Sequence, residues 1–197
     1  MDRPLNFRDR TLHQLPTDMG LLQNNLLEID RYCDIQKMKI NSSKSKTAVF
    51  NAAISKDCYP RLFKAQGTIY ENAEEFTLLG VDFVSDQRVG IKWEKYVLKS
   101  IKKAYSNMWI LKRLVEMGVS RDDLLLTFQS RIRTHVEQNV PLWHFAISKK
   151  LATLIEKVQK ICVFIILGKH ATPNYSRNLS ILDLEPLDER RLKLCKN

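Results

Sequence analysis

A lysine-rich turn, INSSKSK, lies between two segments that predict regular secondary structure, within the stretch Met38–Phe50. Lys44 of this turn carries a positive charge that a phosphate group could approach. A lysine in a polar turn is equally typical of ordinary solvated sequence, so both interpretations stay open at this point. No nucleophile–base pair and no glycine-rich phosphate loop is visible elsewhere in the chain. The turn could therefore act through the positive charge of its lysines.

Asp9 lies in the stretch NFRDRT and is a candidate metal ligand with few other carboxylates near it in the sequence. Arg3, Arg8 and Arg10 surround it, and an isolated carboxylate among arginines is typical of a surface ion pair. The four cysteines never form CxxC, and the four histidines are equally scattered. Because zinc-ligand spacing is absent, the sequence predicts no metal site.

Lysines at helical spacing form a second candidate surface. Apolar residues from Trp93 to Val115 fall within an arc of roughly 80° at 100° per residue. The opposite side of that helix carries Lys95, Lys99, Lys102 and Lys103. A charged face is commonly just solvated, but acidic residues are few here, and Tyr96 and Trp109 flank the lysines. Solvation and contact with nucleic acid are the two interpretations.

The net charge favours a polyanionic partner. The 197 residues include 32 Lys and Arg against 22 Asp and Glu, a net charge of +10. Residues 92–160 hold 14 basic and 6 acidic side chains, whereas residues 51–91 hold 4 and 6. We expect RNA or DNA as the partner, and no membrane. The polar opening residues and the short longest apolar run, VFIIL, predict an intracellular protein of the nucleus or cytoplasm.

The elements that position these residues change character along the chain. A helix is predicted from a cap at Thr17–Asp18 to near Gln36, and a strand is predicted in TAVFNAA after the turn. The segment GTIYENAEEFTLLGVDF predicts two short strands joined by ENAEE. Gly80 would interrupt the second strand as a bulge or a close backbone approach.

The rest of the chain predicts helices almost throughout. Their expected boundaries are stops and caps at Gly118, Ser120, Gly168 and Pro186. The predicted fold class is therefore α+β. It has a small helix-and-hairpin domain over residues 1–90 and a mainly helical domain over residues 91–197.

Several stretches resemble, in this order, the C-terminal half of reverse transcriptases encoded by non-LTR (LINE, jockey-like) retrotransposons. They are MKINSSKSKTAVF, FTLLGV, IKKAYSNMWILKRLVEMGVS, VPLWH, IEKVQK, IILG and LDERRLKLC. The resemblance runs over nearly the whole chain, from Leu21 to Cys195. Each stretch is short, and the order and spacing of the stretches carry the resemblance.

The resemblance implies a palm remnant followed by a thumb. Lys44 matches a lysine near the incoming triphosphate, which is proposed to protonate the departing pyrophosphate. Leu79 and Gly80 match the primer-grip hairpin, which approaches the primer backbone. The basic helix would belong to the thumb and contact the RNA or DNA template–primer. Mg²⁺ would be the cofactor of the intact enzyme.

The chain departs from the family pattern at the metal site. The family holds two Mg²⁺ ions with adjacent aspartates, but here Arg8 takes the first position and only Asp9 remains. Gln138–Asn139 also replaces an aromatic–small pair.

We therefore expect a fragment of an RNA-directed DNA polymerase that is inactive alone and binds no cofactor by itself. The remainder of a reverse transcriptase would be its partner. The alternatives are a stand-alone nucleic-acid-binding module and a helical protein-interaction domain. Salt-dependent binding to an RNA–DNA hybrid would separate the protein-interaction domain from the other two.

Overall fold

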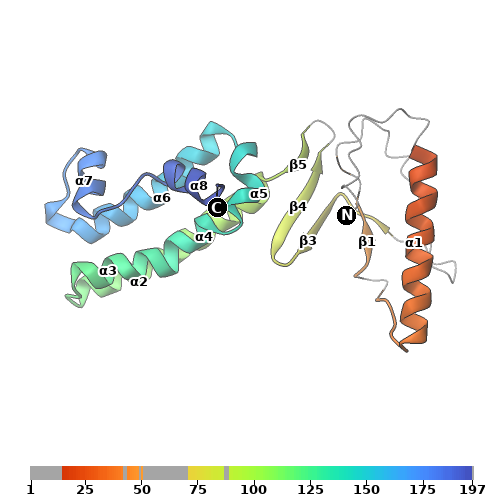
Figure 1. The fold of residues 1–197 in the computed structure, drawn as a ribbon. Coiled ribbons are helices and arrows are strands. Elements are labelled where there is room, and N and C mark those ends of the chain that lie inside the picture. The colour runs from red at the N-terminus through yellow and green to blue at the C-terminus, as the bar shows by residue number, and fades with distance from the viewer. Residues whose placement is uncertain (1–14, 42–43, 49, 51–70, 87–88, 197) are drawn as a thin grey trace. The chain divides into compact units, whose positions relative to one another are not determined.

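The computed structural model describes residues 15–41, 44–48, 50, 71–86 and 89–196. The chain divides into two compact units, Met1–Lys92 and Trp93–Asn197. The first combines one long helix with short strands, and the second is helical (Figure 1). The fold is thus α+β, as the sequence predicts. No helix in the described part of the chain is both long and apolar enough to cross a membrane.

The first unit begins with helix α1, Leu15–Ile35, which starts two residues before the predicted cap. The chain leaves it through Lys37, whose φ is 55°. The backbone N–H of Met38 donates to the carbonyl of Cys33 at 2.8 Å, and the N–H of Lys37 donates to that of Asp34 at 3.1 Å. These two bonds form a Schellman motif that ends the helix ahead of the lysine-rich turn.

Strand β1 is shorter than the sequence predicts. It covers Lys46–Thr47 and pairs in parallel with β2, Glu71–Asn72. The expected strand TAVFNAA is therefore wrong in extent, and its residues 49 and 51–53 lie outside the described part of the chain. The ring of Phe50 lies 6.1 Å from the ring of Phe76, which connects this segment to the next sheet.

A three-stranded antiparallel sheet follows, in the order β3 (Glu75–Leu78), β4 (Val81–Asp86) and β5 (Gly90–Lys92). Leu79 and Gly80 form the tight turn between β3 and β4, with φ values of 50° and 82°. Two successive positive φ values are those of a type I′ hairpin turn. The prediction that Gly80 interrupts a strand is therefore wrong, because the backbone reverses direction there.

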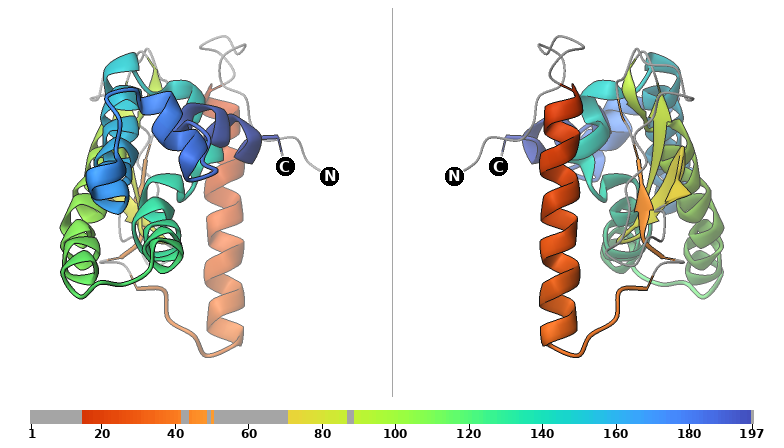
Figure 2. Two further views of the ribbon diagram at one scale, coloured as in Figure 1. Left: turned by 90° about the vertical axis from the view of Figure 1, so that its left-hand side faces the viewer. Right: turned by 90° about the vertical axis from the view of Figure 1, so that its right-hand side faces the viewer.

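The second unit is organised around helix α2, Glu94–Glu116. The predicted apolar stripe is buried from Trp93 to Leu111, and Ala104 is completely enclosed. Val115 is an exception because it lies in the last turn, where it is 41% exposed, beside the 74% exposed Met117. Helix α2 packs against α6 (Lys149–Leu167) and against the helical segments that follow α2 (Figure 2).

Those segments form one helical rod. Its parts are α3 (Arg121–Thr127), the π-helical turn η3 (Phe128–Arg133) and α4 (Thr134–Glu137). Ser120 caps the rod as predicted, since its hydroxyl accepts from the N–H of Asp123 at 3.3 Å. The buried stripe of the rod consists of Leu124, Phe128, Ile132 and Val136.

The π turn explains why this stripe stays on one face. Twelve residues separate Leu124 from Val136, and in a continuous α-helix they would drift by about 120°. A π turn accommodates one additional residue without advancing the helix. Leu124 and Val136 are therefore oriented as if eleven residues separated them, and their directions differ by about 20°. The sequence analysis missed this segment.

A sharp corner connects the rod to the short helix α5, Val140–Trp143. Asn139 has a φ of 57°, and its side-chain amide donates to the Tyr96 hydroxyl at 2.9 Å. The indole N–H of Trp143 donates to the carbonyl of Gln138 at 3.0 Å, and the ring is 1% exposed. Gln138 and Asn139 thus make specific contacts at this corner.

Short helices complete the unit. They are the 3₁₀ turns η4 (His144–Ala146) and η5 (Gly168–His170), with α7 (Tyr175–Ile181) and α8 (Leu187–Leu194). The start of α8 directly after Pro186 is as predicted. Burial raises the pKa of Cys162, inside α6, to about 12, so this thiol stays protonated at neutral pH.

Polar side chains hold α7 and α8 on α6. The Tyr175 hydroxyl donates to Glu156 at 2.5 Å, and the backbone N–H of Leu187 donates to the same carboxylate at 2.9 Å. The amide of the fully buried Gln159 donates to the carbonyl of Glu185 at 2.9 Å. Burial, and then the bond to Glu156, raise the pKa of Tyr175 well above its usual range. The phenol therefore remains a donor at neutral pH.

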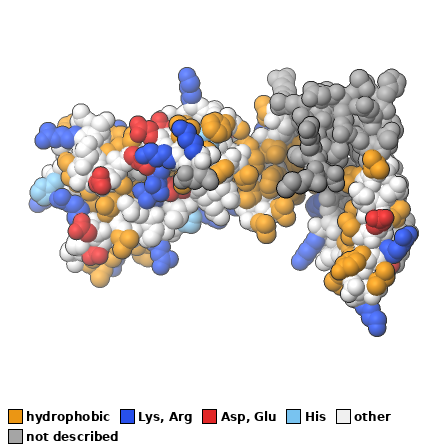
Figure 3. Space-filling view, in the orientation of Figure 1, with side chains coloured by type: hydrophobic (Ala, Val, Ile, Leu, Met, Phe, Trp, Pro, Cys, Tyr) orange, Lys and Arg blue, Asp and Glu red, His pale blue; other side chains and the backbone are white. Residues whose placement is uncertain are grey.

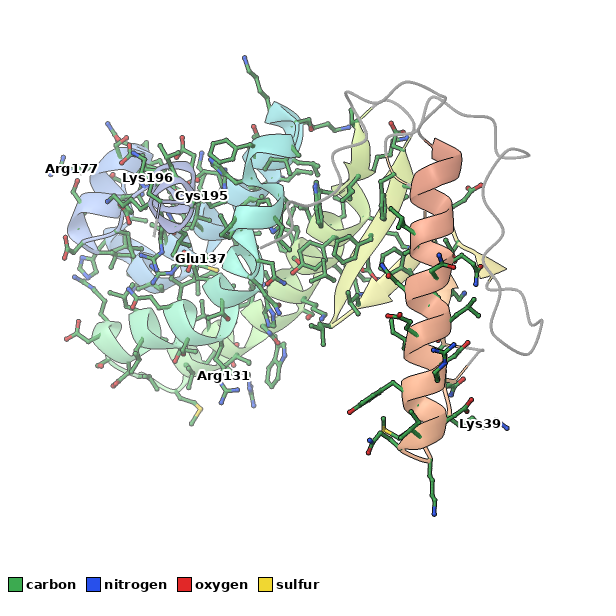
Figure 4. All side chains as sticks on the ribbon, turned by 45° about the vertical axis from the view of Figure 1, so that its right-hand side comes forward. Lys39, Arg131, Glu137, Arg177, Cys195 and Lys196 are labelled. Atoms are coloured by element: carbon green, nitrogen blue, oxygen red, sulfur yellow. The ribbon has the colours of Figure 1, made fainter. Side chains whose placement is uncertain are left out.

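An ion-pair network joins α8 to the rod. Glu137 accepts a hydrogen bond from the guanidinium of Arg190 and lies 3.4 Å from Nε of Arg133. Glu185 pairs with Arg190 at 3.7 Å and with Lys193. Glu137 is labelled on the helical unit in Figure 4. Its side chain is only 13% exposed, so its charge depends on the two arginines.

Replacing Leu79 with Asn is expected to stabilise the β3–β4 hairpin by about 0.5–1 kcal/mol, because Asn tolerates the left-handed backbone better than Leu. Little burial is lost, since Leu79 is 93% exposed. Native-state amide exchange of the two strands measures the change. Leu78→Asn is the matched control at a strand position that is 56% exposed, where Asn should destabilise the hairpin. Equal effects of both variants would contradict the turn assignment.

Glu137→Gln is expected to lower the free energy of unfolding by roughly 2 kcal/mol, because it leaves the half-buried Arg133 without its paired carboxylate and leaves Arg190 with Glu185 alone. Chemical denaturation measures this loss. The matched control is Glu116→Gln, since Glu116 pairs with Arg113 at 2.9 Å while both side chains are more than half exposed. That variant should lose less than about 1 kcal/mol. If Glu137→Gln lost no more stability than Glu116→Gln, the ion-pair network would contribute little to the stability of the fold.

Candidate nucleic-acid interface

The four predicted lysines lie together on α2. Because the apolar face of α2 is buried, helix geometry directs the opposite face to solvent. Lys95, Lys99, Lys102 and Lys103 are all exposed there, and we call them the lysine ridge. From Lys95 to Lys103 the ridge extends about 12 Å along the helix at 1.5 Å per residue. A rigid helix thus presents four ammonium groups within little more than two turns.

The ridge belongs to the strongly basic part of the chain. Residues 93–197 contain 19 Lys and Arg against 10 Asp and Glu, a net charge of +9. Residues 1–92 contain 13 against 12, a net charge of +1. Figure 3 shows Lys and Arg side chains projecting from the helical unit. The charge that would attract a polyanion therefore resides in that unit.

A neighbouring element extends the ridge with polar side chains that the sequence analysis missed. The side-chain amide of Asn107, on α2, lies 2.7 Å from Nε2 of His135, on α4, and donates to the carbonyl of Arg131 at 3.3 Å. Figure 4 shows Arg131 projecting from the edge of the unit. The π turn sets the phase of these residues on the rod, and no short-range sequence pattern reveals it.

His135 is neutral at the edge of this surface. Burial lowers its pKa below the ordinary value of 6.5, and the nearby charge of Lys103 lowers it further. Since the NH₂ group of Asn107 can only donate, Nε2 of His135 must accept and its proton must reside on Nδ1. Protonation of His135 would therefore break its hydrogen bond with Asn107 and add a positive charge next to Lys103.

Tyr96 and Trp109, the two aromatic residues expected beside the ridge, differ in exposure. Tyr96 is only 3% exposed, so the prediction that it flanks the lysines is wrong. It is buried because its hydroxyl binds the corner at Gln138 and Asn139. Trp109 is 63% exposed and does lie on the solvent side of α2.

Lys44 and its neighbour Ser45 are both hydrogen-bonded through their backbone to Asn41. The N–H groups of Lys44 and Ser45 donate to the carbonyl of Asn41 at 3.2 and 3.1 Å. The Lys44 side chain is exposed. Asp9, the other residue predicted to be catalytic, lies outside the described part of the chain. Catalytic roles for Lys44 and for Asp9 stay predictions.

Leu79 and Gly80 project at the tip of the β3–β4 hairpin. A glycine at this position provides the φ of 82° that the turn requires. Leu78 and Leu79 expose their side chains beside it. The tip thus offers backbone and apolar surface to a partner, and its role as a primer grip stays a prediction.

His144 is a satisfied histidine in the structure. Nε of Arg191 donates to Nδ1 of His144 at 3.4 Å, and the Arg191 side chain is almost completely buried. Burial lowers the pKa of His144, the charge of Arg191 lowers it further, and Asp188 opposes the shift. His144 therefore packs α8 against the corner as a neutral group.

The stability of the fold is expected to fall in acid. The folded-state pKa values of His135 and His144 lie below 6.5, so the unfolded chain binds more protons as the pH falls below that value. The free energy of unfolding should thus be largest above pH 6.5 and decline through the lowered pKa values.

Denaturation of the wild type and of His135→Gln at pH 7 and pH 5 measures this dependence, because glutamine can still accept from Asn107 but does not titrate. The variant should lose less stability between the two pH values. An NMR titration that places the pKa of His135 above 6.5 would contradict the assignment.

The described residues contain no group of three His, Cys, Asp or Glu side chains that could hold a metal ion. No family model matches the chain, and no curated protein or solved structure matches it either. Its function must therefore be inferred from the geometry and charge of its own residues.

Proposed function

We propose that the helical unit binds the phosphate backbone of a nucleic-acid duplex through the lysine ridge. The observation that supports this proposal is the exposure of four lysines along one side of α2, fixed in direction by the burial of the other side. Phosphate contacts position a protein on a duplex without reading the bases. Lysines along one side of a packed helix suit this task because each acts as a compact point charge.

A wider proposal concerns the polypeptide to which this unit belongs. On the order and spacing of its motifs, the chain is a fragment of a non-LTR retrotransposon reverse transcriptase, and α2 contributes to the thumb. An RNA or DNA template–primer is then the ligand of the ridge. The chain alone would not polymerise, because Asp9 is the only aspartate left in its catalytic turn.

Mg²⁺ belongs to the intact family enzyme in this proposal. At least two carboxylates would be needed to hold the two Mg²⁺ ions. The described residues contain no group of three or more His, Cys, Asp or Glu side chains that could do so. The described residues therefore do not hold the cofactor by themselves.

A second candidate function is protein binding by the opposite end of α2. Met117 is 74% exposed and Leu126, in α3, is 63% exposed. Large exposed apolar side chains mark interaction sites when they are contiguous. This function would leave the ridge as solvated surface, so the salt dependence of nucleic-acid binding separates the two candidates.

Changing the four ridge lysines to glutamine is expected to flatten the salt dependence of duplex binding. Each phosphate contact releases counterions, so log K falls with log salt by about 0.9 per phosphate neutralised. The quadruple variant should lose several such contacts and bind more weakly, by a similar factor for duplexes of different sequence. Fluorescence anisotropy with an RNA–DNA hybrid at several salt concentrations measures both effects.

The matched control removes the same charge elsewhere in the unit, through glutamine substitutions of four other exposed lysines: Lys149, Lys150, Lys157 and Lys169. It should keep most of the wild-type slope. Equal slopes for the wild type and the ridge variant, or no binding by either at low salt, would show that the ridge is only a solvated face. Circular dichroism checks that both variants retain the fold.

A further inference from the structure

Trp109 is the tryptophan of this chain that does not contribute to the core. Its side chain is 63% exposed, whereas Trp93 is 7% exposed and Trp143 is 1% exposed. Among the described side chains, no aromatic ring or cation stacks on its indole. A large, rigid, apolar ring is thus presented to solvent in the middle of a well-packed helix, where it does not stabilise the fold by burial.

The position of Trp109 relative to the ridge indicates its partner. Trp109 lies two turns after Lys102, on the same side of α2, at a distance of about 10 Å along the axis. That span corresponds to about three base steps of a strand at 3.4 Å each. Lys112 follows within one turn, and Arg113 is paired with Glu116 at 2.9 Å. The indole is therefore aligned with cations that would hold a phosphate backbone.

A nucleobase fits this surface better than a protein side chain does. Cations in line with an aromatic ring match the alternation of phosphates and π-faces along a nucleic-acid strand. A base inside a duplex has both faces covered by its neighbours, whereas an unpaired base next to the duplex can offer a face to the indole. The occupant must then be a single-stranded segment that adjoins the duplex.

We propose that Trp109 stacks on an unpaired nucleobase of a single-stranded extension while the lysine ridge holds the adjoining duplex. This inference rests on the proposed function of the ridge and adds a subsite to it. The ridge would supply affinity for any duplex. Trp109 would supply a preference for a junction between duplex and single strand, without selecting among the bases, since every base has a π-face.

The distribution of tryptophans provides a direct assay. Because Trp109 is exposed and the other two are buried, quenching by iodide should act mainly on Trp109. Titration of the full chain with a hybrid duplex that carries a short single-stranded extension is expected to quench this emission and to protect it from iodide. The same duplex with blunt ends should do so much less.

Affinity measurements test the subsite separately. With the extension present, binding should be about 5- to 150-fold tighter than to the blunt duplex, the range expected for stacking on one aromatic ring. Trp109→Leu should abolish that preference and the quenching but leave the salt slope intact, whereas Trp109→Phe should retain part of the preference. Phe145→Leu is the matched control, because Phe145 is 77% exposed in the same unit and is not on α2; it should leave the preference unchanged.

The outcomes distinguish the two levels of the proposal. Normal salt-dependent binding with no preference for the extension, or with a preference that Trp109→Leu retains, overturns the stacking subsite and leaves the ridge proposal intact. No binding to either nucleic acid at low salt overturns the ridge proposal, and the subsite fails with it.

Discussion

Burial of one face of α2 is the constraint on which the helical unit depends. Val97, Ala104 and Leu111 are at most 1% exposed, and α2 contacts both α6 and the rod that contains the π turn. An amphipathic helix has no rotational freedom once its apolar side is packed. The direction of the lysine ridge and of Trp109 is therefore a consequence of the core. A substitution that loosened this packing would disturb the candidate interface without touching any residue in it.

The helical unit was largely predictable because its signals are local and long. The stripe on α2, the Ser120 cap and the Gly118 stop all follow from spacing and backbone preference. The predictions that failed concern residues whose environment is set by distant parts of the chain. Tyr96 is buried by hydrogen bonds to a corner more than forty residues away, and Gln159 is buried by contacts with the C-terminal helices. Polar residues with distant partners resemble surface residues in a sequence.

The first unit was harder to predict because its strands are short and its turn lacks the usual residues. A type I′ turn is most often Asn-Gly or Asp-Gly, and here it is Leu79–Gly80. The leucine made the segment resemble one continuous strand. Strand β5 has only three residues, Gly90–Lys92, and pairing with β4 defines it. Of the candidate site residues, the ridge followed from periodicity, whereas Asn107, Arg131 and His135 depended on the phase of the rod.

The π turn at Phe128–Arg133 also bears on which changes of chain length the protein can tolerate. Deleting one residue there would convert the rod into a continuous α-helix and leave the flanking turns in nearly the same orientation, with Leu124 and Val136 still on one face. Deleting one residue from the middle of α2 would instead rotate every later side chain by about 100° and turn the core stripe toward solvent. The rod is thus a place where sequences of this fold can lose a residue during evolution without losing the core.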